Sequence, residues 1–246
     1  MDNELKQFIE ENIHLIENSI FEDLYDLAFT RFQISEPVGE LTEILLGANI
    51  HPEIYLKKLP KCFLYRSSIK HFKIPDNITY IDDHAFRQSS LTGVIIPNSV
   101  ESIGYRAFYY CTRLASITIP DSVTSIGEDA FYCCTSLESV SIPDSVTSID
   151  KYTFYRCTSL LNVKIGANVT SISRYAFYGC TNLSNVIIPS SVTSIDGIAF
   201  SYCGEKLLIN YAGTKDEWKK IYNEEAFTGT YFTVNCTDGK IVKKKR

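Results

Sequence analysis

Apolar and polar residues alternate along this chain in short segments that return at a long, fixed interval. In segment 114–119 the apolar residues Ile117 and Ile119 stand two apart, a spacing that is typical of a strand with one buried face. Pro120 then ends the strand, because proline cannot donate a hydrogen bond to a ladder. The β-branched stretch 123–126 predicts a second short extended segment. Residues 128–132 predict a helical or 3₁₀ turn that closes the unit.

The same unit recurs every 22 or 23 residues, and its most regular markers are Phe86, Phe108, Phe131, Phe154, Phe177 and Phe200. A single unit cannot bury its own apolar side chains, so neighbouring units must stack. Stacking in register places equivalent residues in ladders about 4.8 Å apart. The sequence therefore predicts six coils, from about residue 69 to residue 203, with the phenylalanines adjacent in one interior column.

The repeated pattern L-x-x-[VI]-x-I-P-x-x-V-x-x-I-x-x-x-A-F-Y-x-C-T resembles the leucine-rich repeat of the BspA-like, treponemal type. The resemblance implies a curved solenoid with a parallel sheet on its concave side, and a non-enzymatic binding or adhesion protein. Segments 211–218 and 234–239 also resemble the end piece that follows such repeats. The expected fold class is an α/β solenoid, a stack of leucine-rich repeat coils with a helical N-terminal cap and a small C-terminal cap.

Three parts are expected along the chain: a helical cap or domain at 1–60, the solenoid at 61–210, and a C-terminal cap with a basic tail at 211–246. Helical spacing of apolar residues, together with the capping box from Ser19 to Glu22, predicts helices in the first part. These helices either shield the first coil or form a separate interaction module.

The C-terminal part carries signals for a helix and a hairpin. Thr214 and Glu217 form a capping-box pattern, which predicts a short helix through Ile221 with Trp218 covering the last coil. Residues 230–241 then predict a hairpin that turns at Asp238-Gly239.

Charge and hydropathy exclude several classes of partner. The net charge is −5 and the sequence pI is about 5.5, so no basic field over the whole domain attracts nucleic acid. The acidic, amphipathic start does not resemble a signal peptide, and no window approaches the ~20 apolar residues that span a bilayer. We therefore expect a cytoplasmic protein with neither a nucleic-acid partner nor a membrane partner.

Cysteine and histidine offer little chemistry. Five cysteines each follow a repeated phenylalanine by three residues: Cys111, Cys134, Cys157, Cys180 and Cys203. Stacked in register, they form a ladder of small buried side chains whose parallel Cβ vectors suit a disulfide poorly. Their spacing does not match a zinc site. The four histidines are scattered, and no nucleotide-binding or nucleophile motif occurs. The sequence thus predicts no enzyme, no metal and no cofactor.

Two sets of outward residues remain as candidate protein-binding surfaces. The outward strand positions vary between units, and such a variable sheet face is the usual binding surface of a solenoid. They include Lys70, His71, Lys73, Ser116, Thr118, Glu138, Ser141, Asn162, Lys164 and Asn185. A second stripe consists of Tyr109, Tyr132, Tyr155 and Tyr178, which either bind a partner or plate the outside of the coils.

The preferred interpretation is a non-enzymatic protein that binds a protein partner by steric recognition on a preformed surface. Two alternatives stay open. One is a phage or mobile-element inhibitor of a host protein, and the other is a bacterial cell-surface adhesin.

Overall fold

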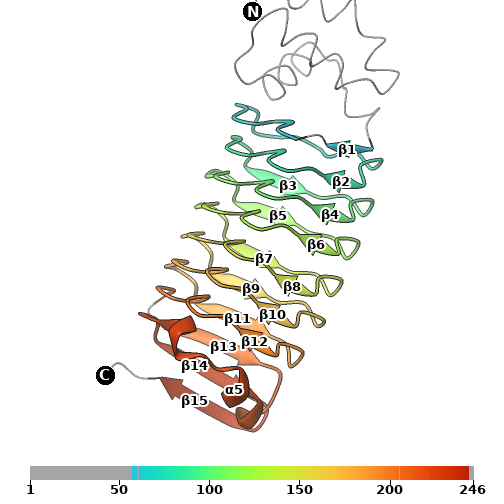
Figure 1. Cartoon of the computed structure of the whole chain (residues 1–246). Helices are drawn as coiled ribbons and strands as arrows, with labels where there is room; N and C mark the ends of the chain where they lie inside the picture. Colours follow the sequence, from blue (N-terminus) through green and yellow to red (C-terminus); the bar gives the residue numbers. More distant parts are fainter. Residues whose placement is uncertain (1–56, 60, 205, 244–246) are drawn as a thin grey trace, which may run out of the picture.

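A computed structural model describes residues 57–59, 61–204 and 206–243, and the predicted N-terminal helices lie outside these residues. The described chain winds into a stack of flat coils that runs from β1 to the C-terminal cap (Figure 1). Each coil has a long-strand side, a short-strand side and a turn side. The long strands are β3 (Gly93–Ile95), β5 (Ser116–Thr118), β7 (Ser139–Ser141), β9 (Asn162–Lys164), β11 (Asn185–Ile188) and β13 (Leu207–Tyr211).

The short-strand side of the coils consists of two-residue strands: β1 (Lys58–Leu59), β2 (Tyr80–Ile81), β4 (Ser102–Ile103), β6 (Ser125–Ile126), β8 (Ser148–Ile149), β10 (Ser171–Ile172) and β12 (Ser194–Ile195). β6 confirms the second extended segment predicted at 123–126. Pairing between coils is parallel and in register, so that Val94 lies beside Ile117 and Ile172 beside Ile195. Equivalent residues of the repeat therefore form ladders, as predicted.

The phenylalanine column fills the interior of the stack. Each of the six predicted phenylalanines is completely buried, and neighbouring ring centroids lie 4.9–5.4 Å apart from Phe86 to Phe227. The column is one coil longer at each end than the sequence indicated. The Leu64 amide donates to the Ala85 carbonyl as the Phe86 amide donates to Ala107, so Leu64 takes the phenylalanine position at one end. Phe227 takes it at the other.

The turn side corrects the predicted fold class, because the coils close without helix. Asp129 and Cys133 have positive φ values of 58° and 55°, which interrupt any helical run through 128–132. Alternate backbone amides of this turn donate to the next coil, as Phe131 N does to the Thr153 carbonyl at 2.9 Å, and the amides between them donate only three residues back, as Tyr132 N does to the Asp129 carbonyl. The described residues therefore form a β-solenoid with little helix rather than an α/β solenoid.

Both rows of strands are interrupted at one level of the stack. β5 forms no ladder with β7, and β6 forms none with β8, within the part of the chain that the structure describes. The turn side continues across this level, because Phe131 and Phe154 stack with centroids 5.2 Å apart. The coils on either side of this level are therefore joined on the turn side and by single backbone bonds, such as that from the Glu138 amide to the Ala115 carbonyl at 3.2 Å.

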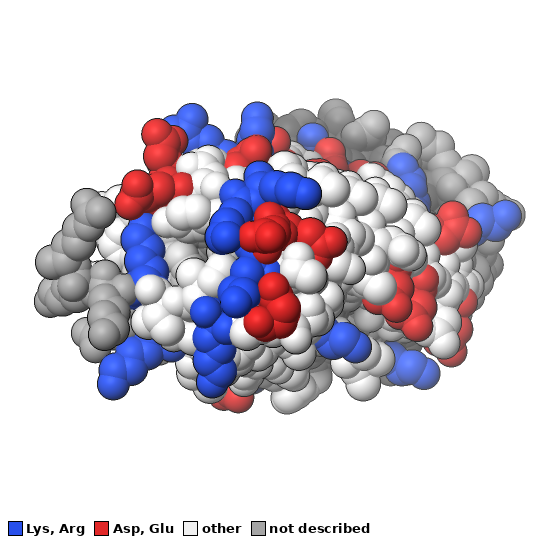
Figure 2. All heavy atoms as spheres, turned by 90° about the horizontal axis from the view of Figure 1, so that it is seen from below, with Lys and Arg blue, Asp and Glu red and all other residues white. Residues whose placement is uncertain are grey.

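The C-terminal cap covers the last coil with α5 (Lys215–Ile221), the 3₁₀ helix η2 (Glu224–Phe227) and a hairpin of β14 (Phe232–Cys236) and β15 (Gly239–Lys243). Helix and hairpin both confirm the sequence prediction. Trp218 is 2% exposed and packs on the Phe227 ring, with a centroid distance of 6.1 Å. Acidic and basic side chains lie side by side across the outer end of the stack, which Figure 2 views from below.

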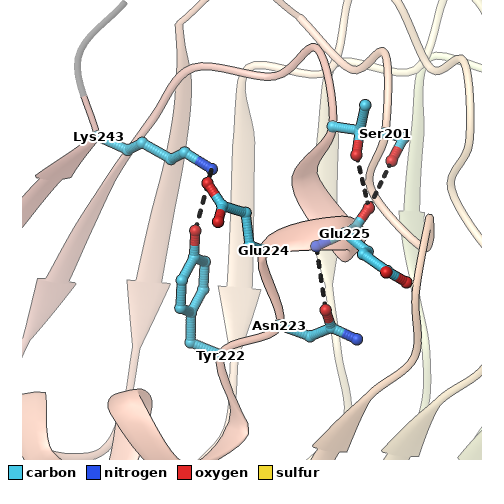
Figure 3. Close-up of polar contacts among 7 residues, drawn as sticks. Ser201, Tyr222, Asn223, Glu224, Glu225 and Lys243 are labelled. Carbon is cyan, nitrogen blue, oxygen red and sulfur yellow. Dashed lines mark hydrogen bonds and ion pairs between the residues drawn. The ribbon is translucent and has the colours of Figure 1, made fainter. Parts of the chain in front are cut away.

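Polar contacts hold the cap together and join it to the solenoid at Ser201 (Figure 3). The Ser201 hydroxyl donates to the Glu225 carbonyl at 3.0 Å, and the Asn223 side chain accepts from the Glu225 amide at 3.0 Å. On the far side of η2, Lys243 Nζ donates to the Tyr222 hydroxyl at 3.0 Å and lies 3.3 Å from Glu224 Oε1. The exposed end of the stack is therefore closed by hydrogen bonds as well as by aromatic packing.

The capping box at Thr214 gives a first testable prediction. Thr214 Oγ1 accepts from the Glu217 amide, and the Glu217 carboxylate accepts from the Thr214 amide at 2.7 Å. We expect Thr214→Ala to lower the free energy of unfolding by about 1 kcal/mol in urea titrations, because α5 loses its N-cap acceptor. Thr214→Ser keeps the oxygen and serves as the control. An equal loss in both variants would contradict the capping role.

Candidate functional site

The outward face of the long strands brings most of the first candidate set together. Ser116 lies beside Gly93, and Thr118 lies beside Ile95. Further along, Ser141 pairs with Lys164, and Asn162 pairs with Asn185. All ten predicted residues of this set reach the surface, and Asn185 is only half-buried. We call this surface the long-strand face.

Register corrects the membership of this face at one position. Asn162 pairs with Ser139, so Ser139 and not Glu138 stands in the row of Ser116 and Asn162. Glu138 precedes β7 and occupies the row of Ala115 and Leu161, as backbone bonds between these three residues show. Lys70 lies in that same edge row, because the Thr92 amide donates to its carbonyl. Counting the period from Ser116 would have identified Ser139 from sequence alone.

A hollow of about 570 Å³ opens on the long-strand face near its N-terminal end. Its floor is Gly93, which has no side chain between His71 and Ser116 in the same row. It is also lined by Phe72, Lys73, Val94, Ile95 and Thr118. This hollow therefore unites four residues of the candidate set, namely His71, Lys73, Ser116 and Thr118.

Exposed apolar side chains distinguish the long-strand face from the rest of the surface. Ile95 is 75% exposed and Val242 57%, and Leu161, Ile187 and Leu208 are also exposed. Asparagines lie among them and bond to one another across coils. Asn210 donates to Asn185 Oδ1 at 2.8 Å, and Asn235 donates to Asn210 Oδ1 at 2.9 Å. This combination of rigid backbone, exposed apolar groups and amides suits contact with another protein surface.

The turn side carries the second candidate set as a continuous tyrosine ladder. Ring centroids lie 4.7 Å apart between Tyr109 and Tyr132, 4.6 Å between Tyr132 and Tyr155, and 5.1 Å between Tyr155 and Tyr178. A shorter ladder runs beside it, with Tyr152 and Tyr175 stacked at 4.8 Å. The predicted stripe is thus a real feature, and its rings plate the turns while their edges remain half-exposed.

Matches to known proteins agree with this architecture. The BspA type leucine rich repeat region matches residues 6–99 and 79–207 in six copies. The chain belongs to the BspA type leucine-rich repeat family. The match begins within the segment predicted as an N-terminal cap, so the boundary at residue 60 stays a prediction.

The chain is also similar to solved leucine-rich repeat proteins of several bacteria. A leucine rich repeat protein of T. pallidum is 26% identical, with 66% of this chain and 81% of that chain covered and a TM-score of 0.53. A leucine-rich repeat protein from Bacteroides ovatus is 27% identical, with 70% and 49% covered and a TM-score of 0.48. A leucine rich cell surface protein from Faecalibacterium prausnitzii is 26% identical, with 68% and 60% covered and a TM-score of 0.38. No curated protein matches the chain.

The repeat cysteines of this family member are packing residues with a backbone role. The Cys157 thiol donates to the Phe131 carbonyl at 3.2 Å, and the other column thiols contact the preceding phenylalanine carbonyl in the same way. Burial raises the pKa of Cys134, Cys157 and Cys180 well above the ordinary value, and it raises that of Cys111 to about 12. These thiols are therefore neutral and poor nucleophiles.

Among the described residues, no group of three or more His, Cys, Asp or Glu side chains is placed to hold a metal ion. None of the helices described has the length and apolar character needed to cross a membrane.

Proposed function

We propose that this chain is a non-enzymatic binding protein whose long-strand face recognises a protein partner. One observation supports this above the others. Of the seven large apolar side chains exposed in the described residues, five lie on or at the edge of this face, and the other two are Tyr110 and Tyr202 on the turn side. Packing within the solenoid does not require these five to be apolar, because equivalent positions in neighbouring coils carry Thr, Ser or Asn.

Recognition on this face is steric and preformed. Ladders on both sides hold β9, β11 and β13 in register, so binding there orders few side chains and costs little conformational entropy. The apolar groups give affinity by leaving water, whereas the asparagine amides and the hollow at Gly93 select the shape and polarity of the partner. The same face serves whether the partner is a host protein that is blocked or a surface to which a cell attaches. A cytoplasmic location stays a prediction.

The repeat itself supplies conservative variants for the test. Ile95→Thr, Ile187→Asn and Leu208→Asn each install the residue that a neighbouring coil carries in the same row, namely Thr118, Asn210 and Asn185. In affinity capture from native lysate, followed by titration of the purified partner, we expect the triple variant to bind about a hundredfold more weakly. Each lost apolar contact contributes about 1 kcal/mol.

Tyr132→Ser with Tyr155→Ser is the matched control on the turn side, and it should retain the partner. Thermal unfolding of each variant verifies that the solenoid is intact. If the triple variant captures the same partner with unchanged affinity while the tyrosine variant loses it, the long-strand face is not the recognition surface.

A further inference from the structure

The tyrosine ladders leave few ring faces free for a ligand. Tyr132 is stacked on both sides, by Tyr109 at 4.7 Å and by Tyr155 at 4.6 Å, with interplanar angles of 18° and 15°. What the ladder presents outward is ring edges and hydroxyl groups. Burial is the first cause that raises the pKa of Tyr109, Tyr132 and Tyr178 above the ordinary value. These phenols are therefore neutral hydrogen-bond donors at physiological pH.

Arginines are held against these rings along the whole turn side. The Arg106 guanidinium lies 4.7 Å from the Tyr105 ring centroid and 4.8 Å from that of Tyr109. Arg87 lies between Tyr65 and Tyr109, at 5.4 Å and 5.3 Å. Cation–π contact holds each guanidinium in place while its N–H groups can still donate.

Further along the stack, Arg156 lies 5.5 Å from the Tyr155 ring and Arg174 lies 5.0 Å from the Tyr175 ring. We call the set of tyrosines and arginines on the turn side the tyrosine–arginine face. It consists of Tyr65, Tyr105, Tyr109, Tyr110, Tyr132, Tyr152, Tyr155, Tyr175, Tyr178 and Tyr202 with Arg66, Arg87, Arg106, Arg156 and Arg174.

The charge of this face is opposite to that of the chain. In the turns 61–66, 83–88, 105–110, 128–133, 151–156, 174–179 and 197–202, five arginines, Lys61 and Lys151 stand against the carboxylates of Asp83, Glu128 and Asp129, in a protein whose net charge is −5. Asp83 accepts from the Tyr105 amide at 2.7 Å, and Asp129 accepts from Arg106 Nε at 3.0 Å. Because cations outnumber carboxylates in these turns, the face carries an excess of positive charge.

One turn of this face has buried polar groups that no described residue satisfies. Four buried side-chain nitrogen or oxygen atoms make no hydrogen bond within the described residues, and three of them lie in the turn 84–88: His84 Nδ1, Arg87 Nε and Gln88 Oε1. Burial, and then the charges of Arg87, Lys61 and Arg106, lower the pKa of His84. Buried polar atoms without partners are uncommon in folded proteins, and a positive field surrounds these.

We propose that the tyrosine–arginine face is a second binding surface, and that it takes an acidic segment of a protein whose Asp and Glu carboxylates bond to Arg87, Arg156 and Arg174. Planar guanidinium groups donate to carboxylates in paired hydrogen bonds, and tyrosine hydroxyls add neutral donors between them. This surface is separate from the long-strand face and does not depend on the function proposed for it. Nucleic acid fits less well, because bases need free aromatic faces on which to stack and the ladder rings cover one another.

The experiment uses a labelled poly-glutamate peptide as the probe and fluorescence anisotropy as the readout. We expect the whole chain to bind poly-glutamate at low ionic strength, more weakly as salt is added, and not to bind poly-glutamine. Arg87→Gln with Arg156→Gln should weaken binding about tenfold, because charge-assisted hydrogen bonds are lost. Arg87→Lys with Arg156→Lys keeps the charge but loses the paired hydrogen bonds of the guanidinium groups, so the affinity for poly-glutamate should fall less.

Lys73→Gln with Lys164→Gln is the matched control, since it removes the same charge from the long-strand face and should leave poly-glutamate affinity unchanged. Arg156→Gln with Arg174→Gln repeats the test at two exposed positions should the Arg87 variant unfold. The triple variant Ile95→Thr, Ile187→Asn and Leu208→Asn should keep its affinity for poly-glutamate. No binding by the unmodified chain, an equal loss in the lysine control, or tighter binding of oligothymidylate than of poly-glutamate would each overturn the proposal.

Discussion

Phe154→Ala is expected to lower the free energy of unfolding by about 3–5 kcal/mol, the usual cost of removing a buried aromatic side chain. Phe154 is completely buried and stacks between Phe131 and Phe177, with centroids 5.2 Å and 5.3 Å away. Its removal leaves a cavity in the middle of the column, and the flanking coils are held apart by their own backbone bonds, so the cavity does not collapse. Urea titration followed by circular dichroism measures the loss.

Phe154→Leu is the matched control, because Leu64 occupies the equivalent position in the first described coil. It fills most of the space, and we expect a loss below about 1.5 kcal/mol. If alanine costs no more than leucine at this position, the phenylalanine column does not hold the coils together.

The free energy of unfolding is expected to fall steeply as the pH rises above 9. Burial raises the pKa of the five column thiols above the ordinary 9.0, so the folded state keeps these protons while the unfolded state loses them. The stabilisation from neutral thiols is therefore fully present below pH 9 and is lost as the pH rises toward the folded pKa values. One pH unit above the unfolded value, each thiol costs about 1.4 kcal/mol.

At about pH 10 five such thiols together lower the free energy of unfolding by about 7 kcal/mol, which is comparable to the stability of a typical domain. Urea midpoints measured at neutral pH and at intervals above pH 9 should fall steeply. Cys157→Ala with Cys180→Ala lowers stability at neutral pH. Because two of the five thiols are then missing, the urea midpoint should fall less steeply above pH 9 than in the parent. A pH dependence as steep in this double variant as in the parent would assign alkaline unfolding to other groups, such as the tyrosines.

The interior of the fold could be predicted from sequence because stacking forces equivalent residues to repeat. Phe108, Phe131, Phe154 and Phe177 form the predicted column, and the period also located both rows of strands. The coils at the two ends were missed because their residues differ from the repeat. Leu64 replaces phenylalanine, and Phe227 follows Phe200 by a longer interval that includes α5.

The turns could not be predicted from local propensity. Segment 128–132 contains good helix formers, yet hydrogen bonds to the adjacent coil hold Asp129 and Cys133 at positive φ, where few residues other than glycine are favourable. The composition of the turn-side surface could be predicted only in part from the sequence. Sequence spacing identified the tyrosine stripe, but the arginines over its rings come from positions that vary between units, so only the structure brings them together.

Within the described residues, the two strand rows add no ladder to the contact between the coils of β5 and β7. The aromatic rings on the turn side continue through this level, and single bonds such as that from the Glu138 amide to the Ala115 carbonyl also cross it. A ligand seated entirely on β9, β11 and β13 would meet strands that are paired on both sides, whereas one that reaches from Ile95 to Lys164 would cross the level without ladders and itself link the two groups of paired strands.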